Sequence, residues 1–139
     1  MKTDHKIVIV GGGAGGLELA CKLGRELGPS KVTLVDRNLT HIWKPSLHEV
    51  AAGTLDVHAE GLSYRMLAHD NGFNFVYGPM IELDREKQIV VVGSVWSDTG
   101  HMLIQDRELP YTELVIAVGS TSNYFGVPGA AEHLSLIHI

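Results

Sequence analysis

The residues that run from Gly11 to Gly16 constrain this chain more than any other segment. They contain the pattern GxGxxG, with Gly11, Gly13 and Gly16 in its fixed positions, between the apolar run 6–10 and the segment 14–27. In a strand–turn–helix unit, the first glycine permits a tight turn, the second lets backbone approach a pyrophosphate, and the third lets helix and strand pack closely. The free N–H groups at the start of the helix favour an anion. The motif therefore predicts a dinucleotide phosphate as ligand, and a glycine-rich turn without a ligand is the alternative.

The residues on either side of the glycines predict a βαβ unit. Residues 6–10 are mostly β-branched, which is typical of a strand buried on both faces of a parallel sheet. Residues 14–27 place apolar side chains at helical spacing, and Gly28 with Pro29 ends that helix. Residues 31–35 form the next strand, reached by a right-handed crossover. The sequence therefore predicts an α/β fold with a Rossmann-type parallel sheet.

The rest of the chain predicts shorter elements. Residues 38–59 are mixed in polarity and predict a long ordered loop with a short helix near 47–52. Residues 59–69 predict a second helix, which the pair 71–72 stops. Residues 114–118 are continuously apolar and suit the central parallel sheet. Strand-like runs separated by turns predict a small antiparallel meander, over residues 73–77, 80–83, 88–95 and 101–104.

Asp36 ends the second predicted strand, twenty residues after Gly16. At this position an acidic side chain can accept hydrogen bonds from both hydroxyls of an adenosine ribose, and it would repel a 2′-phosphate. The ligand is therefore expected to be FAD or NAD rather than NADP. A surface aspartate that caps the following turn is the alternative, and Arg37 could pair with a phosphate or face water.

Composition narrows the function classes. The 139 residues fit one domain or less, and 45% apolar with 19% charged residues predicts a folded core. The net charge is −5 and the basic residues are scattered singly, so nucleic-acid binding is not expected. Cys21 is the single cysteine, which excludes an internal disulfide and a CxxC redox pair. The histidines are also spread singly and predict surface or satisfied core residues rather than metal ligands.

Three blocks of the sequence together resemble the N-terminal part of bacterial type II NADH:quinone dehydrogenases. The blocks are residues 6–36, 40–56 and 114–123, in the order that the family has them, and the resemblance extends to about Gly129. It implies a flavoprotein with two dinucleotide-binding sites. The first glycine motif would bind FAD, and a later motif in an inserted domain would bind NADH as substrate.

The resemblance also implies roles for particular residues. The glycine loop would hold the FAD pyrophosphate and Asp36 the adenosine ribose. Lys44 and Pro45 fall in the family's loop near the flavin ring, and Met80 in its segment against the adenine. A second glycine motif closes over the cofactor, and here Val118 replaces its usual threonine. The expected cofactor-binding residues are Gly11, Gly13, Ala14, Gly16, Asp36, Lys44, Pro45, Met80, Gly119 and Ser120. No catalytic acid, base or nucleophile and no metal ligand is expected.

The implied parent enzyme passes a hydride from NADH to FAD and then two electrons to a membrane quinone, without pumping protons. It would lie peripherally on the cytoplasmic side of the inner (plasma) membrane, held by a C-terminal region. Two alternatives stay open, a flavin reductase with a soluble acceptor and a truncated remnant without catalytic activity. The single cysteine counts against relatives that reduce disulfides or oxidise sulfide.

Residues 1–133 are expected to form the N-terminal part of an FAD-binding domain, incomplete at its C-terminal end. No second glycine motif of this kind follows Gly129. Residues 134–139 depart from the family pattern, so we expect a non-native or truncated tail, read through from unrelated sequence. A sheet that lacks its closing strands has an unpaired edge, so the isolated chain is expected to aggregate.

Overall fold

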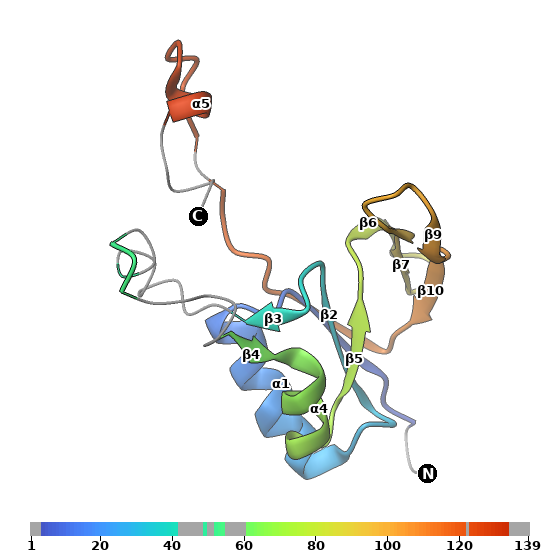
Figure 1. The fold of residues 1–139 in the computed structure, drawn as a ribbon. Helices are drawn as coiled ribbons and strands as arrows, with labels where there is room; N and C mark the ends of the chain where they lie inside the picture. The colour runs from blue at the N-terminus through green and yellow to red at the C-terminus, as the bar shows by residue number, and fades with distance from the viewer. Residues whose placement is uncertain (1–3, 42–48, 50–51, 55–60, 122, 134–139) are drawn as a thin grey trace.

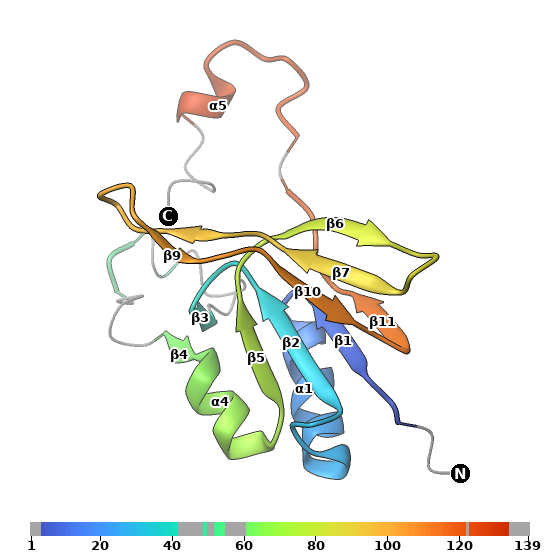
Figure 2. The same ribbon diagram turned by 90° about the vertical axis from the view of Figure 1, so that its right-hand side faces the viewer.

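A four-stranded parallel sheet forms the centre of the fold. The computed structural model describes residues 4–41, 49, 52–54, 61–121 and 123–133. The strand order is β11–β1–β2–β5, and every neighbouring pair is parallel. The chain passes from β1 to β2 through a helix and later returns to the other side of β1 with β11 (Figure 2). The predicted α/β fold with a Rossmann-type sheet is confirmed. The strands are β1 (Ile7–Val10), β2 (Val32–Asp36), β5 (Asn74–Tyr77) and β11 (Glu113–Ile116).

Helices α1 (Ala14–Leu27) and α4 (Tyr64–Asn71) cover one face of this sheet (Figure 1). α1 has the predicted bounds, and Gly28 caps it with φ 86°. α4 ends at Gly72 in the left-handed conformation, at the predicted stop. A short helix, α5 (Ala130–His133), lies away from the sheets in both views (Figures 1 and 2). Within the described part of the chain, no helix is long and apolar enough to cross a membrane.

The predicted start of the second helix at residue 59 is wrong. Leu62 and Ser63 instead form the short strand β4, which pairs antiparallel with β3 (Thr40–His41). Ser63 is also the N-cap of α4, and its side chain accepts a hydrogen bond from the Met66 N–H. This cap satisfies one of the free donors at the start of the helix, which fixes the first turn at Tyr64. The short helix predicted near 47–52 lies almost wholly outside the described residues.

An antiparallel sheet covers the opposite face of the parallel sheet (Figure 2). Its order is β10–β7–β6, and a hairpin of β8 and β9 continues from it. The predicted meander is right in kind, but the strand at Arg107–Pro110 was not predicted, and two of the predicted runs differ from the structure. Residues 73–77 belong to the parallel sheet, and the run 88–95 is divided by Gly93 and Ser94 into two strands. The strands are β6 (Met80–Asp84), β7 (Ile89–Val92), β8 (Val95–Trp96), β9 (Met102–Ile104) and β10 (Arg107–Pro110).

Two clusters of buried side chains hold the three layers together. Because successive strand residues face opposite sides, Ile9 and Leu34 face the helices while Val8 and Val10 face the antiparallel sheet. The helix-side cluster is Ile9, Ala20, Val32, Leu34, Tyr64, Ala68 and Phe73, and the other is Val8, Val10, Val35, Val90 and Val92. Packing on both faces fixes the carboxyl ends of β1 and β2 at a common edge, where the glycine loop begins.

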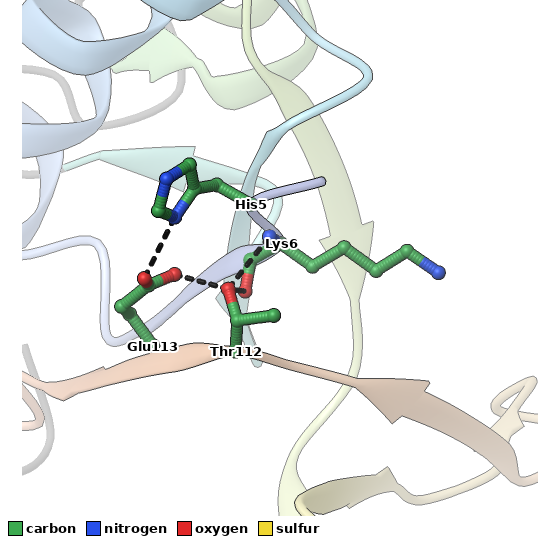
Figure 3. A network of polar contacts seen from close by, with 4 residues as sticks. All are labelled: His5, Lys6, Thr112 and Glu113. Atoms are coloured by element: carbon green, nitrogen blue, oxygen red, sulfur yellow. Dashed lines mark hydrogen bonds and ion pairs between the residues drawn. The ribbon is translucent and has the colours of Figure 1, made fainter. Parts of the chain in front are cut away.

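A polar cluster joins the residues before β1 to the start of β11 (Figure 3). The Thr112 N–H donates to the Lys6 carbonyl at 2.8 Å, and the Lys6 N–H donates to Thr112 Oγ1 at 2.9 Å. The Glu113 carboxylate accepts a hydrogen bond from the Thr112 hydroxyl, and its other oxygen lies 2.8 Å from His5 Nδ1. The hydrogen bonds from Thr112 and then from His5 lower the pKa of Glu113. The cluster closes the β1–β11 pair at the end opposite the glycine loop.

Candidate cofactor-binding site

A cleft of about 900 Å³ lies at the carboxyl ends of the parallel strands. Its walls come from the segments that follow β1, β2 and β11, from the connection between β5 and β6, and from the start of α4. β2 and β11 lie on opposite sides of β1, so the cleft is located where the strand order reverses. Open α/β sheets bind their ligands at this position.

The glycine loop forms one wall, and two of its glycines are required by the backbone. Gly11 has φ 102°, and a Cβ there would lie 2.4 Å from the Ala117 carbonyl oxygen. A Cβ on Gly16 would lie 1.8 Å from the Gly11 carbonyl oxygen. The Gly11 N–H donates to the Val35 carbonyl at 2.8 Å, which ties the turn to β2. The tight turn at Gly11 and the close packing at Gly16 that the motif predicts are both present.

The start of α1 is open toward the cleft. Gly13 is the N-cap, no side chain caps the helix, and the first turn has no acidic residue. A Cβ on Gly13 or Gly15 would meet nothing within 4 Å. The first N–H groups of a helix have no partner within the helix and carry positive partial charge. The space beside Gly13, Ala14 and Gly15 therefore suits a phosphate group, as the binding of a dinucleotide requires.

Asp36 lies in the cleft, and each of its carboxylate oxygens accepts a hydrogen bond from a backbone N–H. One oxygen accepts a hydrogen bond from the Gly12 N–H at 2.7 Å, and the other accepts from the Asn38 N–H at 2.8 Å. The second bond caps the turn after β2, so the alternative reading of Asp36 describes part of its geometry. A carboxylate offers about four acceptor positions, so acceptors remain for ribose hydroxyls.

The structure brings the predicted cofactor residues together wherever it describes them. Gly11, Gly13, Ala14, Gly16, Asp36, Met80, Gly119 and Ser120 all line this one cleft, although they come from distant parts of the sequence. Arg37 lines it too. Lys44 and Pro45 lie outside the described residues. Cofactor binding by these residues stays a prediction, and their convergence is the geometric fact that supports it.

Among the cleft residues that were not predicted from the sequence, two have buried polar side chains that contact the glycine loop. His41 and Tyr64 are buried, and both contact the carbonyl of Gly12, from His41 Nδ1 at 2.9 Å and from the Tyr64 hydroxyl at 2.5 Å. Burial, and then the nearby Asp36 carboxylate, raises the pKa of Tyr64 far above its ordinary value. His41 falls in the block 40–56 that carries the resemblance, but no spacing in the sequence signals that either residue contacts Gly12. The general expectation of satisfied core histidines holds for His41.

The fold and the position of the cleft are those of Rossmann-type α/β domains, a class that binds dinucleotides at the carboxyl ends of its strands. The chain belongs to the pyridine nucleotide-disulphide oxidoreductase family, whose pattern matches residues 5–138.

Curated relatives indicate which members of this family the chain resembles. The chain is 49% identical over 130 residues to a type II NADH:quinone oxidoreductase of Haemophilus influenzae, covering 91% of this chain and 29% of that protein. It is 32% identical over 138 residues to a type II NADH:quinone oxidoreductase of Staphylococcus epidermidis, covering 96% of this chain and 31% of that protein. The resemblance seen in the sequence is confirmed, and the chain spans about three tenths of the length of these relatives.

A solved structure supports the fold. The structure of NDH2 from Plasmodium falciparum in complex with NADH superposes with a TM-score of 0.72 at 24% identity. The match covers 94% of this chain and 25% of that one.

Proposed function

We propose that this chain is the FAD-binding part of an NADH:quinone oxidoreductase. The observation that carries the proposal is the convergence of the predicted residues around one cleft, beside an open helix N-terminus and an acidic residue at the end of β2. When bound, FAD would supply the redox chemistry, taking a hydride from NADH and giving two electrons to a membrane quinone without proton pumping. We also propose a peripheral position on the cytoplasmic side of the inner membrane for the whole protein.

The residues of this chain would bind and orient the cofactor rather than react. N–H groups at Gly13 and Ala14 would hold the pyrophosphate, and the approach that Gly13 leaves open admits it. Met80 would lie against the adenine. Gly119 and Ser120 would close over the cofactor with backbone, and Lys44 and Pro45 would lie near the flavin ring.

Asp36 is the residue that selects among dinucleotides in this proposal. Its carboxylate is already oriented by the N–H groups of Gly12 and Asn38. A fixed negative charge accepts the ribose hydroxyls and repels a phosphate at the same place. FAD satisfies both conditions, because its adenosine ribose carries free hydroxyls.

The test is to purify the full-length natural protein and measure its flavin. We expect FAD at close to one per chain, bleaching of the flavin absorption by NADH under anaerobic conditions, and reoxidation by a quinone. Protein that binds no FAD after incubation with it would overturn the proposal. Reoxidation by ferredoxin or rubredoxin but not by quinones would show that the acceptor is soluble.

A pair of Asp36 variants tests the ribose contact. Asp36→Ala removes the ribose acceptor and also the acceptor of the Gly12 and Asn38 N–H groups, so we expect FAD retention to fall on the order of tenfold or more, as for hydrogen bonds to a charged group. Asp36→Asn keeps one carbonyl acceptor and should lose less. Unchanged FAD affinity in Asp36→Ala would show that the ribose contact is misassigned.

A further inference from the structure

We propose that Tyr64 and His41 are positioning residues, which hold the Gly12 carbonyl inward so that the N–H of Gly13 faces the pyrophosphate of the cofactor. The inference rests on the proposed function, because it takes FAD as the ligand of the cleft. It assigns a task to two buried side chains that lie outside the glycine motif.

The Tyr64 and His41 side chains form a clamp on the Gly12 carbonyl. This carbonyl accepts one hydrogen bond from the Tyr64 hydroxyl at 2.5 Å and one from His41 Nδ1 at 2.9 Å, and both bonds are buried. A carbonyl oxygen has two lone pairs, so these donors saturate it. Because the oxygen can only accept, His41 carries its proton on Nδ1.

The geometry of the peptide bond transmits this contact to the cleft. In a trans peptide, the carbonyl of one residue and the N–H of the next point in opposite directions. Gly12 is buried and Gly13 lines the cleft. With the Gly12 carbonyl held against His41 and Tyr64 in the interior, the Gly13 N–H is directed outward, to the place where the phosphate is expected. The Gly12 N–H is fixed separately by Asp36 at 2.7 Å.

Other contacts within the protein hold the two donors in place. The Tyr64 ring stacks on Phe75 with centroids 5.1 Å apart, and its edge contact with His41 has centroids 6.0 Å apart. The Tyr64 N–H donates to the Leu39 carbonyl at 3.0 Å, and His41 pairs with Leu62 across the β3–β4 ladder. Burial raises the pKa of the Tyr64 hydroxyl further above its ordinary value, so the hydroxyl stays a donor throughout the physiological pH range.

The clamp also explains why residue 12 is a glycine. A Cβ on Gly12 would lie 2.6 Å from Cε1 of Tyr64 and 2.7 Å from its hydroxyl oxygen. The GxGxxG pattern leaves this position free. Its glycine is therefore explained by the approach of Tyr64, and not by the cofactor.

The experiment uses apoprotein of the full-length chain, reconstituted with FAD, and compares dissociation constants. Tyr64→Phe keeps the ring packing and removes the hydroxyl, and we expect FAD to bind about 3- to 10-fold more weakly, the value of one neutral hydrogen bond. His41→Leu should have a similar effect. His41→Asn places an amide N–H near the position of Nδ1 and should restore most of the affinity.

The matched control is Phe73→Leu, which alters the same buried cluster without lining the cleft. It should lower the stability of the apoprotein and leave the FAD dissociation constant within twofold of wild type. FAD binding by Tyr64→Phe and His41→Leu that equals wild type would overturn the clamp while leaving the proposed function intact. A loss that merely follows apoprotein stability, as calibrated by Phe73→Leu, would overturn it too. Wild-type protein that binds no FAD would remove both proposals.

Discussion

At the scale of single residues, the glycines of the loop do different work. Gly16 is enclosed by backbone, because its Cβ would overlap the Gly11 carbonyl oxygen. A Cβ on Gly13 would meet nothing within 4 Å, so the lack of a side chain there matters only if a ligand approaches the backbone. The structure therefore agrees with the different roles that the motif gives these two positions, with Gly16 needed for folding and Gly13 open to a ligand.

These different roles predict opposite outcomes for two alanine variants. Gly16→Ala should prevent folding of the full-length protein, since backbone cannot retreat from a contact of 1.8 Å. Gly13→Ala should fold, with at most about 1 kcal/mol lost at the helix cap, and should bind FAD at least tenfold more weakly. Urea unfolding followed by flavin titration separates the two. Gly15→Ala is the control for Gly16→Ala, because a Cβ on Gly15, unlike one on Gly16, would meet nothing within 4 Å. A folded Gly16→Ala protein would contradict the packing argument.

Much of the candidate site was predictable at this scale, and the reason is local. Gly11, Gly13, Gly16 and Asp36 sit at fixed spacings within one βαβ unit, so a short stretch of sequence determines their relation. His41 and Tyr64 contact Gly12 across 29 and 52 residues of sequence. Their contact depends on how β3 and α4 pack against the glycine loop, and no periodicity in the sequence indicates this packing.

At the scale of elements, the two helices meet at a glycine contact. A Cβ on Gly24 of α1 would lie 2.6 Å from the Asn71 carbonyl oxygen and 3.0 Å from Gly72. The approach lets both helices lie flat on the helix-side cluster. Arg25 adds a hydrogen bond to Asn71 at 2.7 Å beside it.

Gly24→Ala should therefore destabilise the fold although alanine is the better helix former. The gain in helix propensity is about 1 kcal/mol, and forcing the backbones apart costs about 1–3 kcal/mol. We expect a net loss of up to about 2 kcal/mol in urea denaturation. Lys22→Ala on the exposed side of α1 is the control, since it removes only an exposed ion pair with Glu18. Equal or greater stability of Gly24→Ala would mean that the helices are not in close contact.

Prediction of the elements succeeded where the pattern was strong. β1, β2 and α1 are continuous in their apolar periodicity, and their bounds were predicted to within a residue. β5 is an edge strand with mixed burial, so its sequence does not distinguish the parallel sheet from the meander. β10 carries charged residues and a proline, and it forms a strand because β7 pairs with it.

At the scale of the whole molecule, three layers are built from segments far apart in the sequence. β11 is added to β1 after more than a hundred residues, and it is an edge strand in the described part of the chain. Ile116 and Val118 near its end are exposed. The assignment of residues 1–133 to one domain, and the expectation of aggregation through an unpaired edge, stay predictions.

The cluster of His5, Thr112 and Glu113 predicts how acid affects this long-range closure (Figure 3). The folded state lowers the pKa of Glu113 below its ordinary value of 4.5, so its contribution to stability is complete above that pH. The contribution is lost as the pH falls through the lowered pKa, because the protonated carboxyl no longer accepts both hydrogen bonds as a charged group.

Glu113→Gln should therefore flatten the dependence of stability on pH in the acid range. The amide has no charge to lose, so the difference in unfolding free energy between wild type and Glu113→Gln should shrink as the pH falls below 4.5. Urea unfolding at a series of pH values measures it. Glu82→Gln, an exposed glutamate on β6 outside the cluster, is the matched control and should keep the wild-type slope. A difference between wild type and Glu113→Gln that is constant across this range would show that the carboxylate charge does not help to hold β11 against β1.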